Sequence, residues 1–106
     1  MAQFDVHRNN GKNRHAIPFV VVVQSSVFDS YRRRVVVPLV RKSFLTAISD
    51  TRFNPIFNIG RIAVVLHPLE IVSVPSEQLG KFVKSLANEG NRIMDALDQL
   101  LTRAWG

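Results

Sequence analysis

The sequence contains no cysteine among its 106 residues. This absence excludes a disulfide framework, a cysteine nucleophile and a zinc site built on thiolates, and it fits the reducing cytosol. Long apolar runs are also missing. The longest, Ala16–Val23, is interrupted by Pro18, whereas a membrane-spanning helix needs about 20 apolar residues. The opening residues, MAQFDV, lack the charged and then apolar pattern of a secretory signal. We therefore expect a cytoplasmic protein with no membrane segment.

Acidic residues are scarce in the first part of the chain. Residues 1–61 hold ten Lys and Arg against three Asp and Glu, a balance of +7, while the rest of the chain carries −1 and the whole +6. A basic half suggests an acidic partner, either nucleic acid or an acidic protein surface, and the alternative is a solvated basic face without a partner. The length predicts a single domain over residues 1–106 with one modest core.

Signals for catalysis are few. The sequence has no glycine-rich phosphate loop, no G-x-S-x-G and no H-E-x-x-H motif. His7, His15 and His67 lie far apart without the spacing of metal ligands, so we expect surface or packing histidines. Acid–base catalysis needs two titratable groups brought together, and no such pair is evident. The sequence therefore predicts a protein that is not an enzyme and that uses no cofactor or metal.

Short β-branched stretches separated by turn residues predict an antiparallel sheet. The expected strands are Gln3–Arg8, Phe19–Gln24, Arg33–Val40, Pro55–Ile59, Arg61–His67 and Glu70–Val74. Pro38 and Pro75 are expected at strand edges or ends, because proline has no N–H to donate to a ladder.

Two stretches show helical periodicity. Phe44–Ile48 predicts a short helix, and residues 88–103 predict a longer one that packs against the sheet through a single apolar stripe. The stripe consists of Ile93, Leu97, Leu100, Leu101 and Ala104. Gly90 should weaken the first turn by about 1 kcal/mol relative to alanine. Strands followed by one terminal helix predict an α+β fold with a barrel-like antiparallel sheet.

Two further features raise the question of partners. In a strand, Arg32 and Arg34 would share one face and Arg33 the other. Such a run of arginines could contact phosphates. However, no aromatic residues alternate with these arginines, as they do in proteins that bind single-stranded nucleic acid. We therefore expect no direct sequence-specific contact with nucleic acid. Trp105 is the only tryptophan. It either folds back onto the sheet or anchors an interface, because tryptophan is enriched at binding hot spots.

Several stretches resemble the CcdB family of toxins from bacterial toxin–antitoxin pairs. They are QFDV at Gln3–Val6, FVVVVQSSVFD at Phe19–Asp29, RRVVVPL at Arg33–Leu39, NPIFNIG at Asn54–Gly60, VSVP at Val72–Pro75 and RIMDALDQLL at Arg92–Leu101. The resemblance covers nearly the whole chain and is weakest at residues 9–17 and 40–53. It implies a homodimer whose fold is a twisted antiparallel sheet of the SH3-like barrel type shared by CcdB and MazF, with a C-terminal helix.

The resemblance also implies a function. Such a toxin binds the DNA gyrase A subunit, traps gyrase on cleaved DNA, serves plasmid maintenance and is neutralised by a CcdA-like antitoxin. By position, the gyrase-facing residues are Gln3, Phe4, Ser25, Val27, Phe28, Leu101, Thr102, Trp105 and Gly106. We expect an acidic, disordered antitoxin segment to bind the basic residues Arg8, Lys12, Arg14, Arg41 and Lys42.

The C-terminal tail departs from the family pattern. The best-known member ends in Trp-Gly-Ile, whereas this chain ends in Thr-Arg-Ala-Trp-Gly. Alignment of the helix places Thr102 where that tryptophan would be, and Trp105 follows three residues later. Two alternatives therefore stay open. One is an endoribonuclease toxin of the MazF or Kid type, for which Arg33, His67 and Asp29 are the candidates. The other is a chromosomal relative that keeps the fold without toxicity.

Overall fold

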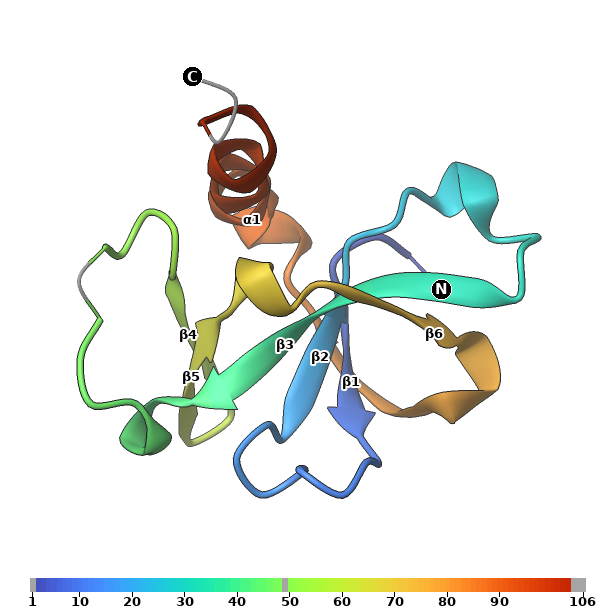
Figure 1. The fold of residues 1–106 in the computed structure, drawn as a ribbon. Coiled ribbons are helices and arrows are strands. Elements are labelled where there is room, and N and C mark those ends of the chain that lie inside the picture. Colours follow the sequence, from blue (N-terminus) through green and yellow to red (C-terminus); the bar gives the residue numbers. More distant parts are fainter. Residues whose placement is uncertain (1, 49, 104–106) are drawn as a thin grey trace.

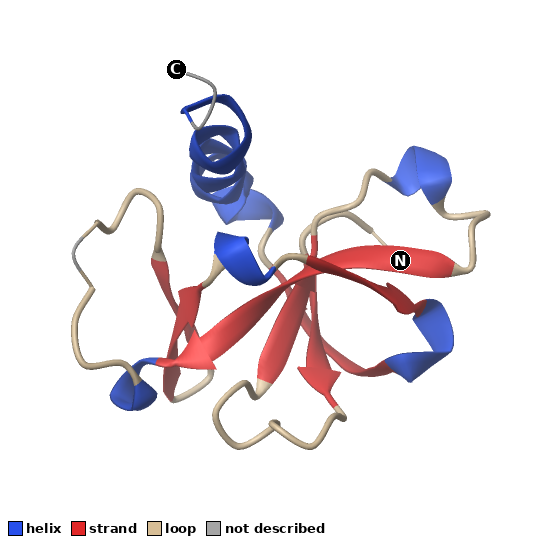
Figure 2. Cartoon of the chain, in the orientation of Figure 1, coloured by secondary structure: helices blue, strands red, loops and turns tan. Residues whose placement is uncertain are grey.

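The computed structural model describes residues 2–48 and 50–103. In this part of the chain, seven strands form one curled antiparallel sheet in the order β4–β5–β3–β2–β1–β7, and β6 also pairs with β3 (Figure 1). The strands are β1 (Asp5–Asn9), β2 (Phe19–Val22), β3 (Arg33–Arg41), β4 (Ile56–Ile59), β5 (Ile62–Leu66), β6 (Val72–Pro75) and β7 (Leu79–Ser85). One α-helix, α1 (Gly90–Asp98), follows them (Figure 2). The predicted α+β class, with a barrel-like sheet and a C-terminal helix, is confirmed.

The nine-residue strand β3 organises the sheet. Along one side it pairs with β2. Along the other side its first half pairs with β6 and its last residues pair with β5. The two arms of the sheet therefore diverge from β3, and this divergence gives the half-barrel its curl (Figure 1). β6 ends at Pro75, as predicted for a proline at a strand end.

Pro38 contradicts the prediction that it lies at a strand edge or end. It lies inside β3 opposite Val20 of β2, and on the other side its carbonyl accepts a hydrogen bond from the His67 N–H (3.1 Å). In an antiparallel strand the N–H and C=O of one residue point to the same side. On that side the partner of β3 changes from β6 to β5 between Val36 and Leu39. The missing N–H thus falls where the ladder is already interrupted.

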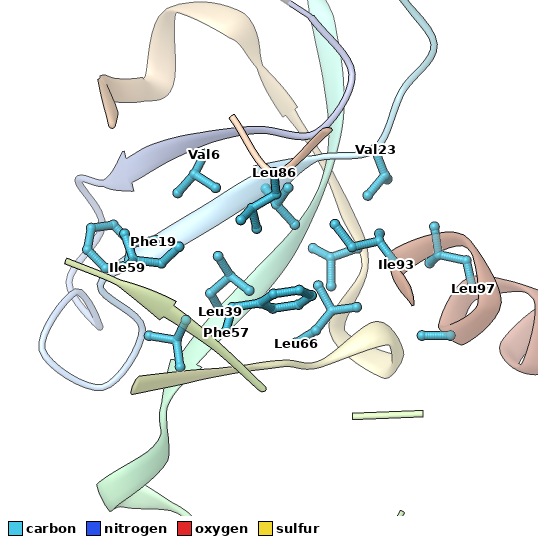
Figure 3. Packing of buried hydrophobic residues seen from close by; sticks show 14 residues of the cluster. Val6, Phe19, Val23, Leu39, Phe57, Ile59, Leu66, Leu86, Ile93 and Leu97 are labelled. Atoms are coloured by element: carbon cyan, nitrogen blue, oxygen red, sulfur yellow. The ribbon is translucent and has the colours of Figure 1, made fainter. Parts of the chain in front are cut away.

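The hydrophobic core lies between the sheet and α1 (Figure 3). Ile93, Ala96 and Leu97 are buried against the sheet, which confirms the start of the predicted apolar stripe. The end of the stripe was predicted wrongly: Leu100 is half-buried and Leu101 is 72% exposed. After Asp98 the chain winds as a π turn over Gln99–Arg103, which lies beyond the sheet, and Ala104 lies outside the described residues.

Two other segments differ from the predictions. The short helix expected at Phe44–Ile48 is absent; a 3-10 turn at Lys42–Phe44 precedes irregular chain, and Phe44 stays half exposed beside His15. Strand β7 was not predicted, because its apolar residues Leu79, Phe82 and Val83 do not alternate with polar ones and it packs on the sheet only through a few half-buried residues. No helix in the described residues is long and apolar enough to span a membrane.

Candidate partner-binding site

The N-terminal residues Gln3 and Phe4 are fixed at the end of β2. The Gln3 side-chain Nε2 donates to the Val23 carbonyl (2.9 Å). The Phe4 N–H donates to the Val22 carbonyl (2.6 Å), and the Phe4 carbonyl accepts from the Leu86 N–H (2.8 Å). These bonds hold Phe4 at φ +72°, a left-handed conformation that costs a non-glycine residue energy.

That conformation places the Phe4 ring against the first turn of α1. A Cβ on Gly90 would lie only 2.7 Å from Phe4 Cε2 and 3.1 Å from Phe4 Cδ2. Gly90 is therefore required for the close approach of the ring, although its helix propensity is poor. The sequence analysis assigned Gly90 only this propensity cost. Its packing role becomes visible once the N-terminus and the helix are seen side by side.

The segment after β2 presents exposed apolar side chains. Ser25 caps the 3-10 turn η1 (Ser26–Phe28) by accepting from the Val27 N–H. Val27 is 79% exposed and Phe28 is 50% exposed. Because Gln3 bonds to Val23, two residues before Ser25, Gln3 and Phe4 lie beside the start of the loop that carries three further predicted target-binding residues. We call them the candidate face: Gln3, Phe4, Ser25, Val27 and Phe28.

Two of the remaining predicted target residues, Leu101 and Thr102, lie after α1 in the π turn Gln99–Arg103. Leu101 and Thr102 are exposed, and the Thr102 hydroxyl donates to the Asp98 carbonyl. They follow the whole length of α1, which begins at Gly90 where the helix meets the Phe4 ring. Figure 1 shows α1 and the η1 turn rising on the same side of the sheet. Trp105 and Gly106 lie outside the described residues.

Two polar side chains beneath the η1 loop hold it in place, and the sequence analysis missed both roles. Arg34 is only 7% exposed; its guanidinium donates to the carbonyls of Asp29 (2.9 Å), Tyr31 and Arg33 (2.9 Å). Its Nε lies 3.9 Å from a carboxylate oxygen of Asp29.

Gln24 supports the loop from the end of β2. Its Nε2 donates to the carbonyls of Phe28 (3.2 Å) and Arg33 (3.2 Å), and its Oε1 accepts from the Val35 N–H (3.0 Å). Arg33, by contrast, stays exposed and donates to the side chain and carbonyl of Ser73 on β6. Arg33 and Arg34 thus point to opposite faces, as the alternation of a strand predicts.

The residues predicted to bind an antitoxin lie at the end of β1, on the loop that follows it and at the end of β3. Lys12 and Arg14 are exposed on the loop between β1 and β2. The structure ties this loop to the end of β3, because the Arg41 N–H donates to the Ala16 carbonyl (2.8 Å) and Arg41 Nε donates to the His15 carbonyl (3.1 Å). Arg8 lies near the end of β1, just before this loop, with its guanidinium over the Phe19 ring at 5.9 Å.

Arg61, which was not among the predicted antitoxin-binding residues, lies beside Arg41 and Lys42. Together with Arg41 and Lys42 it lines a shallow hollow of about 460 Å³. The basic patch, as used below, consists of Lys12, Arg14, Arg41, Lys42 and Arg61. It lies at the end of β3 that is opposite to the η1 loop (Figure 1).

The three residues considered for a nuclease are not brought together. His67 meets β3 through the Pro38 carbonyl. Arg33 lies on β3 five residues before Pro38, which corresponds to about 17 Å at the rise of an extended strand. A carboxylate oxygen of Asp29 lies 3.9 Å from Arg34 Nε, at the start of β3. These three residues therefore do not form an acid–base pair beside a cation.

The histidines behave as predicted. His7 is buried, with Nδ1 3.0 Å from the Gly80 carbonyl and its ring edge-on to Phe82. His15 is exposed and contacts Phe44. Within residues 2–48 and 50–103, no three His, Asp or Glu side chains lie close enough together to hold a metal ion.

A known protein family matches nearly the whole chain. The family model described as CcdB protein matches residues 3–103. This chain belongs to the CcdB family. The match includes all five residues of the candidate face and continues to the end of the described helix, and it confirms the resemblance found in the sequence. Membership of the CcdB family places the chain among the toxins of toxin–antitoxin systems, which pair with an antitoxin.

A solved structure shows how widely this fold is shared. The CcdB-family chain is similar to a protein described as "Endoribonuclease in complex with its cognate antitoxin from Mycobacterial species". The TM-score is 0.72 at 14% sequence identity, over 95% of this chain and 94% of that chain. At this identity the likeness establishes a common fold and carries no conclusion about activity.

Proposed function

We propose that this CcdB-family toxin binds the DNA gyrase A subunit and poisons gyrase by trapping it on cleaved DNA. The observation that carries the proposal is that Gln3, bonded to Val23, lies beside the start of the loop on which Val27 and Phe28 are exposed. The family resemblance assigns these residues, with Phe4 and Ser25, to gyrase. Exposed apolar side chains on a hydrogen-bonded loop favour a protein partner, because such a surface gains free energy when it is desolvated.

In this proposal the toxin acts by binding and is not an enzyme. The alternative, an endoribonuclease, is suggested only by the shared fold, and its candidate residues Arg33, His67 and Asp29 lie apart. Incubation of purified protein with RNA in the absence of gyrase distinguishes the two. We expect intact RNA, and cleavage that scales with toxin concentration would favour the nuclease.

The proposal is tested most directly at Trp105. Truncation of a tryptophan hot spot often costs 2 kcal/mol or more, so Trp105→Ala should weaken binding to the gyrase A subunit by about thirtyfold. The melting temperature should hardly change. Calorimetric titration and thermal denaturation of the same variant supply both values. A large loss of stability with unchanged affinity would show that Trp105 packs on its own sheet, and binding would then rest on the candidate face alone.

The antitoxin is proposed to be a CcdA-like protein with an acidic, disordered segment that binds the basic patch. The affinity of the toxin–antitoxin pair should fall as ionic strength rises, because salt screens contacts between exposed charges. Replacing Arg41 and Lys42 by glutamine should lower both the affinity and the slope of that dependence. An affinity that does not change with salt would contradict this electrostatic account.

We further propose that the toxin is a cytoplasmic homodimer that serves plasmid maintenance. Sedimentation equilibrium at micromolar concentration should give about twice the 12.0 kDa mass of one chain. A single species at the mass of one chain would contradict the homodimer.

A further inference from the structure

Tyr31, the only tyrosine of the chain, lies beside the candidate face but is not among the positions that the family resemblance assigns to gyrase. It is 66% exposed. Its ring meets the half-exposed ring of Phe28 edge-on, with centroids 6.0 Å apart and planes at 68°. Two neighbouring aromatic side chains exposed to water are costly in the free protein.

The backbone of this aromatic pair is held firmly. The Tyr31 N–H donates to the Phe28 carbonyl (3.0 Å), and the Tyr31 carbonyl accepts from the buried Arg34 guanidinium. Gln24 holds the Phe28 carbonyl as described above. A surface that is ordered before binding loses little conformational entropy when a partner arrives. The exposed pair therefore has the properties of a preorganised contact surface.

A hollow of about 560 Å³ opens next to the pair. Val23 and Val35 contribute aliphatic side chains to it, Phe28 and Tyr31 line one part, and Arg33 and Ser25 supply polar groups. Such a lining, largely apolar with a few polar groups, suits an apolar side chain of a partner.

Arg33 gives the hollow its charge. Its Nε donates to Ser73 Oγ (2.8 Å) and its Nη2 donates to the Ser73 carbonyl (2.7 Å), so the guanidinium is anchored on β6. In the described part of the chain, no carboxylate lies within ion-pair distance of Arg33. The Nη1 end of an anchored, unneutralised guanidinium is suited to a carboxylate of a partner.

We propose that Tyr31 and Arg33 determine the specificity of target binding. The hollow receives an apolar side chain of the target protein, and Arg33 pairs with an Asp or Glu beside that side chain. This inference rests on the proposed function and extends it to two residues that the family resemblance does not assign. It also predicts the chemistry of the target surface, namely a large apolar residue adjacent to an acidic one.

The geometry favours a protein over single-stranded nucleic acid as the occupant. Bases stack on open aromatic faces in succession. Here the two rings are inclined at 68° and contact each other, and the hollow beside them includes the aliphatic side chains of Val23 and Val35. A ribose–phosphate chain would find one anchored cation in this hollow, whereas a protein side chain would find an apolar site of matching chemistry.

The experiment measures the affinity of the full-length toxin for the gyrase A subunit. Tyr31→Ala should weaken binding at least about tenfold, whereas Tyr31→Phe, which keeps the ring, should stay within about threefold. Arg33→Gln should weaken binding and make the affinity less dependent on salt. Arg33→Lys, which keeps the charge, should retain part of the affinity and part of the salt dependence. Phe44→Ala is the matched control: Phe44 is also half exposed, but it lies just beyond the opposite end of β3. The affinity of the Phe44→Ala variant for the gyrase A subunit should equal that of the wild type.

The outcomes separate this inference from the proposed function. If the wild type binds gyrase and the Tyr31 and Arg33 variants bind equally well, the inference is overturned and the proposed function stands. If the wild type does not bind gyrase, both are overturned. If the loss of affinity in Tyr31→Ala is accompanied by a large fall in melting temperature, and Phe44→Ala shows no such fall, Tyr31 is a structural residue and the inference fails. Tighter binding of a single-stranded oligonucleotide, abolished by Tyr31→Ala, would assign the hollow to nucleic acid.

Discussion

Replacing Arg34 by methionine should lower the free energy of unfolding by about 3 kcal/mol, because it removes the charged donor of three part-buried hydrogen bonds. The guanidinium serves three backbone carbonyls, those of Asp29, Tyr31 and Arg33, while being only 7% exposed. Methionine fills much of the same volume, so the loss of stability reflects the missing hydrogen bonds more than a new cavity. Urea denaturation followed by circular dichroism measures the change.

Arg32→Met provides the control, since Arg32 is an exposed neighbour of the same size and charge. Its stability should stay within about 0.5 kcal/mol of the wild type, as for most surface substitutions. Arg34→Met should also weaken target binding, because the loop that carries Val27, Phe28 and Tyr31 loses its support. Equal stabilities of the two methionine variants would show that the loop is held by other contacts.

Gly90→Ala should destabilise the protein by about 1 to 3 kcal/mol, the usual cost of overpacking, although alanine is the better helix former by about 1 kcal/mol. The new methyl group would lie 2.7 Å from Phe4 Cε2. The ring cannot easily move away, because hydrogen bonds to Val22 and from Leu86 fix the Phe4 backbone on both sides. Thermal and urea denaturation measure the effect.

A double-mutant cycle with Phe4→Ala tests the cause. Once the ring is removed, Gly90→Ala should stabilise the protein by up to about 1 kcal/mol, since only the helix propensity remains. The sign of the effect therefore reverses between the two backgrounds. If Gly90→Ala has the same effect with and without the Phe4 ring, the contact does not constrain the site, and another reason for the glycine must be sought.

The predictions that succeeded depended on local patterns. β2 and β3 are β-branched stretches whose residues alternate between the two sides of the sheet, and their bounds were predicted to within two residues. Ile93 and Leu97 recur at helical spacing and are buried as expected. The role of the candidate face stays a prediction from the family resemblance, because Val27 and Phe28 look like ordinary apolar residues in the sequence.

The predictions that failed depended on neighbours distant in the sequence. Pro38 fits inside β3 because its partner strand changes there, and Leu101 is exposed because the helix continues beyond the sheet. Neither fact is contained in the residues nearby. Strand β7 was missed because an edge strand with one pairing partner carries a weak apolar signal.

The sequence by itself therefore determined the class of the fold, most strands, the terminal helix and the CcdB family, since each follows from the order and spacing of residues along the chain. The tertiary structure alone decided three features of the site. It showed that Gly90 accommodates the Phe4 ring, that Arg34 is buried beneath the η1 loop, and that Tyr31 and Arg33 line one hollow. These features arise from contacts between segments far apart in the chain, and such contacts are fixed only when the sheet curls and the helix packs against it.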